Sequence, residues 1–277
     1  MLHSRRQFLV GIGLAGGAAL AGGAAFAQTE RSALTVMTSG AFATVLNDLA
    51  PDVEHHFGVR LSIVYGASMG ATPNAIPARL ARNEPADVVI LAADALRLLI
   101  QAGRVRPGTA VDLVRSRIGL AVRAGASVPD ISTVAALKRA LLQARSIAYS
   151  DSASGVYVQR VLFDRLGIRH EVEPKAHMIP GTPVGVALVR GEAELGFQQI
   201  SELLAVPGVT VVGPLPDAVQ HVTVFSAGIT STSMHEQLAK ALIGYLASAA
   251  SRPAIRRRGL DPIDAAGAQG ARASQDD

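Results

Sequence analysis

Short β-branched runs alternate with helical patterns along most of the chain, which is typical of α/β architecture. The pattern predicts strands at 34–37, 60–65, 87–92, 118–122, 146–149, 194–197, 209–212 and 222–227. It predicts helices at 41–56, 76–81, 93–102, 134–144, 155–166, 184–190 and 234–249. Residues 265–277 are small, polar and aperiodic, so we expect a disordered tail there.

The order of these elements predicts two α/β lobes, each of an ordinary domain size. The first lobe comprises residues 28–116 and 223–264, and the second comprises residues 117–222. The chain then crosses between the lobes twice, and the final helix returns to the first lobe. Two crossings leave a cleft between the lobes, where small ligands commonly bind.

The N-terminal segment has the pattern of an export signal. Arg5 and Arg6 precede an uncharged stretch that runs from Phe8 to Ala27. The stretch ends on small residues, as a signal-peptidase site does. Residues 4–9 also fit the twin-arginine pattern, with an ordinary secretory signal as the alternative. We therefore expect residues 1–27 to be a cleaved signal peptide, and the mature protein to be periplasmic.

Composition narrows the class of protein. Hydrophobic residues make up 49% of the chain and charged residues 17%, which excludes an intrinsically disordered protein. The net charge is only +4 and the basic residues are scattered along the chain, so we expect no nucleic-acid partner. The absence of cysteine excludes disulfides, thiol catalysis and cysteine-ligated metals. The seven histidines form no metal-binding pattern, and we expect neither a metal nor a cofactor.

Small and hydroxylic residues gather at four expected junctions between a strand and a helix. These junctions are Thr38–Ala41, Gly66–Gly70, Ser150–Gly155 and Pro180–Pro183. A helix N-terminus offers unpaired amides and about half a positive charge. Each junction alone is typical of an ordinary helix cap. Together, two in each lobe, they predict a site for a small anion that needs no lysine or arginine.

The chain resembles the periplasmic molybdate-binding proteins of ABC importers, within the type II solute-binding fold. The similar segments are Leu34–Phe42, Val64–Ser68, Glu84–Asp94, Ser154–Tyr157 and Ala187–Gly196. The resemblance implies two lobes, each a mixed sheet flanked by helices, with a ligand cleft between them. It also implies a monomer that captures a tetrahedral dianion and presents it to an ABC permease in the inner membrane.

The resemblance also implies which residues bind the ligand. The expected set is Ser39, Gly40, Ala41, Ser68, Ser154, Gly155, Thr182 and Gln199. Two positions depart from the family pattern. Ala41 stands where the family has a serine, and Gln199 stands where the family has a tyrosine. A glutamine amide donates as a tyrosine hydroxyl does, but it differs in reach and also accepts.

We therefore expect a solute-binding protein for molybdate, tungstate or a similar oxyanion, and not an enzyme. Ala41 and Gln199 keep a small organic acid open as an alternative ligand. A different class is an exported serine hydrolase, because Gly66–Gly70 matches the G-x-S-x-G pattern around Ser68. Pro73 and Pro77 lie where the helix of such a hydrolase should start and run.

Overall fold

The computed structural model describes residues 32–70 and 72–263. The predicted signal peptide at 1–27, its twin-arginine pattern and the predicted tail at 265–277 lie outside these residues. Within the described part of the chain, no helix is long and apolar enough to cross a membrane.

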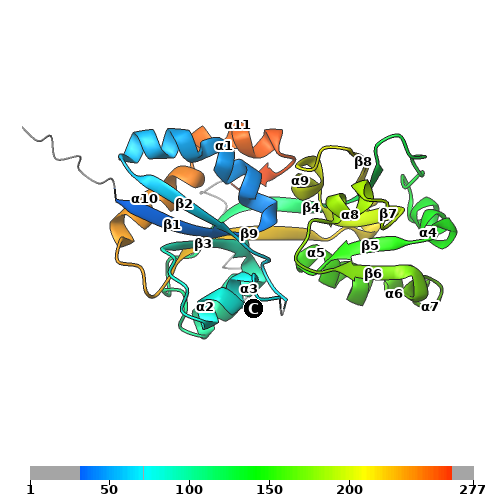
Figure 1. Cartoon of the computed structure of the whole chain (residues 1–277), viewed down its shortest axis with the longest axis horizontal. Coiled ribbons are helices and arrows are strands. Elements are labelled where there is room, and N and C mark those ends of the chain that lie inside the picture. Colours follow the sequence, from blue (N-terminus) through cyan, green and yellow to red (C-terminus); the bar gives the residue numbers. More distant parts are fainter. Residues whose placement is uncertain (1–31, 71, 264–277) are drawn as a thin grey trace, which may run out of the picture. The chain divides into compact units, whose positions relative to one another are not determined.

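The described strands join into one ten-stranded sheet (Figure 1). Its order is β2-β1-β3-β9-β4-β7-β5-β6, with β8 and β10 also paired to β4. The strands are β1 (Ala33–Thr38), β2 (Arg60–Tyr65), β3 (Val88–Ala92), β4 (Val111–Arg123), β5 (Ile147–Ser150), β6 (Ala176–Ile179), β7 (Leu195–Gln199), β8 (Val209–Pro214), β9 (Val222–Ile229) and β10 (Asp261–Pro262).

Strand β4 divides the sheet into two lobes, because its two ends pair with different strands. Residues 111–117 pair antiparallel with β9, whereas residues 118–123 pair with β7 and β8. Strands β1, β2 and β3 are parallel in the first lobe, and β5, β6 and β7 are parallel in the second. Both lobes are thus mixed sheets, as predicted. The exact boundaries, at 116/117 and 222/223, stay a prediction.

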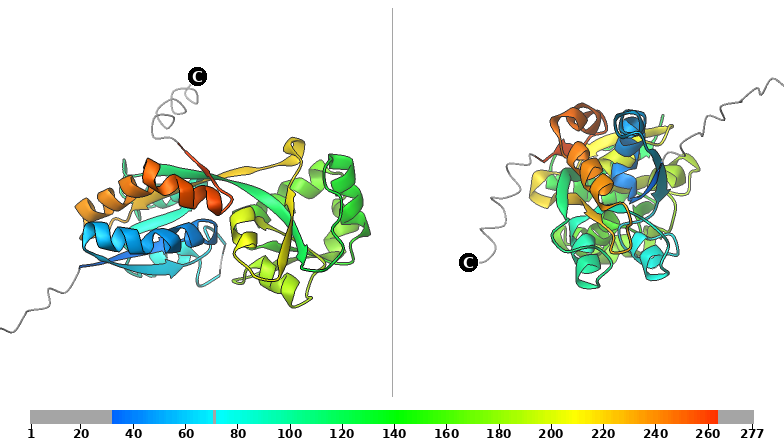
Figure 2. Two further views of the ribbon diagram at one scale, coloured as in Figure 1. Left: turned by 90° about the horizontal axis from the view of Figure 1, so that it is seen from above. Right: turned by 90° about the vertical axis from the view of Figure 1, so that its left-hand side faces the viewer.

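Helices cover both faces of the sheet in each lobe (Figures 1 and 2). The α-helices are α1 (Gly40–Phe57), α2 (Ile76–Ala81), α3 (Ala93–Gln101), α4 (Val134–Gln143), α5 (Ala153–Tyr157), α6 (Phe163–Arg165), α7 (Arg169–Val172), α8 (Val184–Val189), α9 (Ile200–Leu204), α10 (Glu236–Leu246) and α11 (Arg252–Arg257). A π-helical turn, η1 (Val158–Leu162), joins α5 to α6, and 3-10 turns form η2 (Glu173–Lys175), η3 (Asp217–Val219) and η4 (Ala249–Ser251).

Each lobe has its own apolar cores. In the first lobe, α1, α10 and α11 pack on one face of the sheet, and α2 and α3 pack on the other. In the second lobe, α4 to α7 cover one face, and α8 and α9 cover the other. All five residues of β3 are buried, because helices cover it on both sides.

The ends of the longest helix follow from its sequence. Ser39 precedes α1 in an extended conformation, and Gly58 follows it with φ at 64°. Glycine tolerates this left-handed conformation without strain, so it ends the helix cleanly. The buried residues of α1 recur at helical spacing and pack into the first core.

Several predicted boundaries need correction. The predicted helix at 155–166 is three segments, because α5 passes into η1 and then α6. The predicted helix at 234–249 is shorter, and α11 follows it as a separate element. The short elements β6, α7, α9, α11 and β10 were not predicted, and α9 proves central to the site.

Candidate functional site

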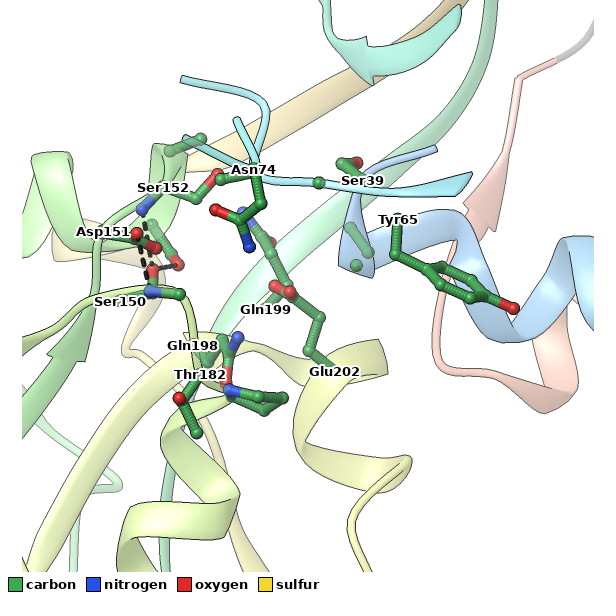
Figure 3. A pocket seen from close by; sticks show the side chains of 18 of the residues that line it. Ser39, Tyr65, Asn74, Ser150, Asp151, Ser152, Thr182, Gln198, Gln199 and Glu202 are labelled. Carbon is green, nitrogen blue, oxygen red and sulfur yellow. Dashed lines mark hydrogen bonds between the residues drawn. The ribbon is translucent and has the colours of Figure 1, made fainter. Parts of the chain in front are cut away.

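A cavity of about 180 Å³ lies between the two lobes (Figure 3). This volume is below the range of roughly 300–1,000 Å³ that is usual for drug-sized ligands, so it suits a small one. Six of the eight predicted residues line it, namely Ser39, Gly40, Ala41, Ser154, Thr182 and Gln199. Ser68 and Gly155 are not among the lining residues. Ligand binding by any of the eight stays a prediction.

The N-terminus of α1 supplies free donors to this cavity. The side chain of Ser39 makes no capping bond, and its buried Oγ has no hydrogen-bond partner among the described residues. The amides of Gly40 and Ala41 lie in the first turn, where no carbonyl of the same helix reaches them. Because α1 has 18 residues, its dipole adds a positive potential at the same place.

The junction after β5 satisfies two of its own amides. Ser150 Oγ accepts hydrogen bonds from the amides of Gly155, at 3.2 Å, and Ser152, at 3.4 Å. The same Oγ lies 2.9 Å from Ser154 Oγ. The amides of Ser152 and Gly155 are therefore already bonded within the protein, whereas the Ser154 amide, the predicted donor, is not part of these bonds.

The junction before α8 is occupied in the same way. Asp151 Oδ2 accepts from the Gly181 amide at 2.9 Å, and Gln198 Oε1 accepts from the Val184 amide at 2.8 Å. The prediction of four helix starts aimed at one anion therefore needs correction. At the junctions after β5 and before α8, side-chain oxygens of the protein already accept hydrogen bonds from backbone amides. Of the four junctions, only the start of α1 is the N-terminus of a long helix.

The junction after β2 begins no helix, because α2 starts ten residues later, at Ile76. Ser68 is buried, and its Oγ accepts from the Ala92 amide at 3.0 Å. Its own amide donates to Ser152 Oγ across the lobes at 3.2 Å. Ser68, which follows β2, thus links this junction to the end of β3 and to the second lobe through hydrogen bonds, and it does not line the cavity. Among the residues that the structure describes, the helix that the hydrolase alternative requires directly after this junction is not formed.

Glu202, on α9, lines the cavity and was not among the predicted site residues. Burial raises the pKa of its carboxyl to about 7. The Gln198 side chain and the Gln199 backbone lower that pKa, and the nearby charge of Asp151 raises it. The available signal was an acidic residue in the first turn of a helix, but no helix was predicted at 200–204. At neutral pH such a carboxyl holds and releases a proton with similar ease.

The carboxyl of Glu202 lies against the first turn of α1. A Cβ atom placed on Gly40 would clash with Glu202 Oε1. Any side chain at this position would force the carboxyl of Glu202 to move. The contact brings the acidic group to the end of α1 that carries the free donors, as Figure 3 shows for Ser39 and Glu202.

Gln199 is buried at the end of β7. Its Nε2 donates to Thr223 Oγ1 at 3.1 Å, which fixes the orientation of the amide. Its Oε1 is buried and has no hydrogen-bond partner in the described part of the chain. The amide thus presents an acceptor to the site, where the resemblance implied a donor.

The charge of the lining differs from that of an ordinary anion site. The charged residues that line the cavity are both carboxylates, Asp151 and Glu202. Among the described residues, no group of three or more His, Asp or Glu side chains is placed to hold a metal ion. The site therefore combines neutral donors with an acid of raised pKa.

Comparison with known proteins gives a related enzyme. A protein of Pseudomonas sp. named aconitate isomerase is 50% identical to the chain over 232 residues, which is 84% of this chain and 88% of the relative. The expectation that the chain is not an enzyme is therefore wrong. The one enzyme that the sequence had offered as an alternative was a serine hydrolase, not an isomerase.

Solved structures share the fold. The periplasmic molybdate-binding protein of Azotobacter vinelandii matches with a TM-score of 0.66 and 19% identity, over 82% of this chain and 98% of that one. Peb3 from Campylobacter jejuni matches with a TM-score of 0.61 and 15% identity, over 82% and 99%. These likenesses confirm the predicted two-lobed type II periplasmic binding protein fold. The family model described as "Bacterial extracellular solute-binding protein" matches residues 34–261, and the chain belongs to that family.

Proposed function

We propose that this chain interconverts the cis and trans forms of aconitate, with Glu202 as the group that moves the proton. The observation that carries the proposal is a carboxyl of pKa about 7 in the cavity of a chain half identical to a protein named aconitate isomerase. An acid of this pKa at neutral pH is suited to general acid–base chemistry.

The chemistry needs only a proton shuttle. Aconitate is a three-carbon chain with one carboxylate on each carbon and one double bond. Glu202 takes a proton from the methylene carbon, and the electron pair spreads over the carbon chain and its carboxylates. The proton then returns to the former vinylic carbon, so the double bond moves to the other side. The product is again aconitate, because the carbon chain carries the same groups at both ends.

The start of α1 supports substrate binding in this proposal. The Ser39 hydroxyl and the first-turn amides are donors next to the carboxyl of Glu202. They would hold a substrate carboxylate and stabilise the charge that develops when the proton leaves. The negative charge of Asp151 would repel a substrate carboxylate, but it is partly offset because Asp151 Oδ2 accepts a hydrogen bond from the Gly181 amide.

The test is whether the purified protein converts trans-aconitate. The conversion is monitored by NMR, through the signal of the vinylic proton. We expect Glu202→Gln to lower kcat by about 10²–10⁴, the usual contribution of a proton-transfer group. The matched control is Glu171→Gln on α7, outside the cavity, which should keep full activity. As a base, Glu202 must be ionised, so kcat/KM of the wild type should fall below about pH 7.

Two results would separate the parts of this proposal. If the wild type converts neither isomer, the isomerase function fails. If it converts them and Glu202→Gln is equally active, the function stands and the role of Glu202 fails.

A second candidate activity is delivery of a small organic acid to an ABC permease. Hydrogen bonds across the lobes support it, from Ser68 to Ser152 and from Thr72 Oγ1 to Asp151 Oδ2 at 3.4 Å. A cavity held shut in this way encloses its ligand. Molybdate is the weaker ligand hypothesis, because Asp151 and Glu202 line the cavity with no cation beside them.

The family description also supports a location outside the cytoplasm. We propose export to the periplasm by the cleaved signal at residues 1–27, through the twin-arginine route.

A further inference from the structure

A second, larger cavity lies between the same two lobes. Its volume is about 710 Å³, within the range that small-molecule sites usually have. Helix α3 of the first lobe forms one wall, and α5 with η1 of the second lobe forms another. Of the described residues, Ala153 alone lines both cavities. The second cavity is therefore a separate space with its own side chains.

One wall of this cavity is flat and aromatic. The rings of Tyr157 and His221 are stacked, with centroids 4.9 Å apart and planes at 14°. The Tyr157 hydroxyl donates to the Val219 carbonyl at 2.7 Å, which holds its ring in place. Around this pair the lining is largely apolar and includes Leu96 and Val156. Such a surface favours a flat apolar group.

The cations of the lining differ in their partners. Arg97 is paired with Asp94 at 2.6 Å. The other acid, Asp112, accepts from the Ser226 hydroxyl at 2.6 Å. Arg160 forms neither an ion pair nor a hydrogen bond with any described residue. Arg160 is therefore the cation with free donors for a ligand, and guanidinium binds carboxylates in a paired geometry.

The backbone at Arg160 is unusual as well. Arg160 and Val161 both line the cavity, and both lie in the π-helical turn η1. Turns of this kind are rare and frequently lie at functional sites. Here the turn places a cation and an apolar side chain on the same wall.

We propose that the second cavity binds a small organic acid with a flat apolar body and a single carboxylate. The body packs on the exposed His221 ring of the stacked pair, and the carboxylate pairs with Arg160. This inference does not depend on the isomerase function, because it uses other residues and no chemical step.

The probe is 2-naphthoate, with the neutral 2-naphthamide as its matched control, and binding is measured by titration calorimetry on the full-length protein. We expect one 2-naphthoate per chain and weaker binding of the amide. Arg160→Gln should weaken 2-naphthoate binding about tenfold, as loss of a charged hydrogen bond does. Arg145→Gln is the charge-matched control, since Arg145 lies in the same lobe outside the cavity, and it should bind as the wild type does.

Two further variants separate the cavities. His221→Ala removes half of the stacked pair and should also weaken 2-naphthoate, whereas Glu202→Gln in the first cavity should not. Absence of binding at millimolar 2-naphthoate would overturn the proposal. Equal affinity in Arg160→Gln and the wild type would overturn it too, as would loss of binding in Glu202→Gln.

Discussion

The partly buried carboxyl of Glu202 makes the stability of the folded chain depend on pH. Its pKa is about 7 in the folded protein and 4.5 as the reference value for an exposed carboxyl. Between about pH 4.5 and 7, the folded state therefore binds more protons than the unfolded state. The free energy of unfolding therefore falls as pH rises from about 4.5 to 7, and it stays lower above that. The raised pKa that suits Glu202 to proton transfer thus also means that the folded protein is less stable when Glu202 is ionised.

Glu202→Gln should therefore be more stable than the wild type at alkaline pH. From the raised pKa, the free energy of unfolding of Glu202→Gln should exceed that of the wild type by about 3 kcal/mol at pH 8.5. This difference should shrink as the pH is lowered toward 4.5. Urea unfolding at both pH values measures it. Glu171→Gln, at an exposed position, should show no such trend. A Glu202→Gln protein that gains nothing at pH 8.5 would mean that the carboxyl is better solvated than its burial indicates.

Helices α1 and α9 approach each other at the position of Gly40. The approach places the acid of the second lobe against the free donors of the first, so the distance between these two helices sets the geometry of the site. A side chain at Gly40 would have to push Glu202 away, since its Oε1 occupies the space of a Cβ.

Gly40→Ala should lower kcat/KM for aconitate by about 10²-fold, because misplacing a reacting group by roughly 1 Å costs that much. The control is Gly244→Ala in α10, where a Cβ would meet no atom within 4 Å. That change should leave kinetics unaltered, and melting curves should show both variants folded. Unchanged activity in Gly40→Ala would indicate that Glu202 rearranges freely and is not held by α1.

The elements that the sequence predicted well are those whose own pattern determines them. Strand β2 and helix α2 begin and end at the predicted residues, 60–65 and 76–81. The elements that were missed are short, and tertiary pairing determines them. Strand β6 has partly exposed residues and no alternation, and it forms because it pairs with β5. Helix α9 has five residues, too few for a helical period to show.

The site was predicted only as far as the junctions between elements. The start of α1 was expected from its small residues, and six of the eight predicted residues do line the cavity. The role of Ser68 as an internal tie could not be predicted, because its partner Ala92 lies 24 positions away. Glu202 was missed with α9, and its raised pKa depends on packing between lobes that no local pattern records.

The path of the chain through the lobes determines when each lobe can be completed. The first lobe begins the chain, but β9 lies between its strands β3 and β4, and its core needs residues from 225 to 260. The second lobe has its main core within residues 118–219, an uninterrupted stretch. The second lobe therefore has the lower sequence separation between its contacting residues.

The later lobe should consequently be the first to fold. Contacts between residues close in sequence form faster, and loop closure over about 100 residues slows the first lobe. In refolding with pulsed hydrogen exchange, amides of β5 and β7 should gain protection before those of β1 and β3. Protection of β1 and β3 first would contradict this order. A ribosome carrying the chain would thus hold a nearly finished second lobe while β1, β2 and β3 still wait for the strand that completes their sheet.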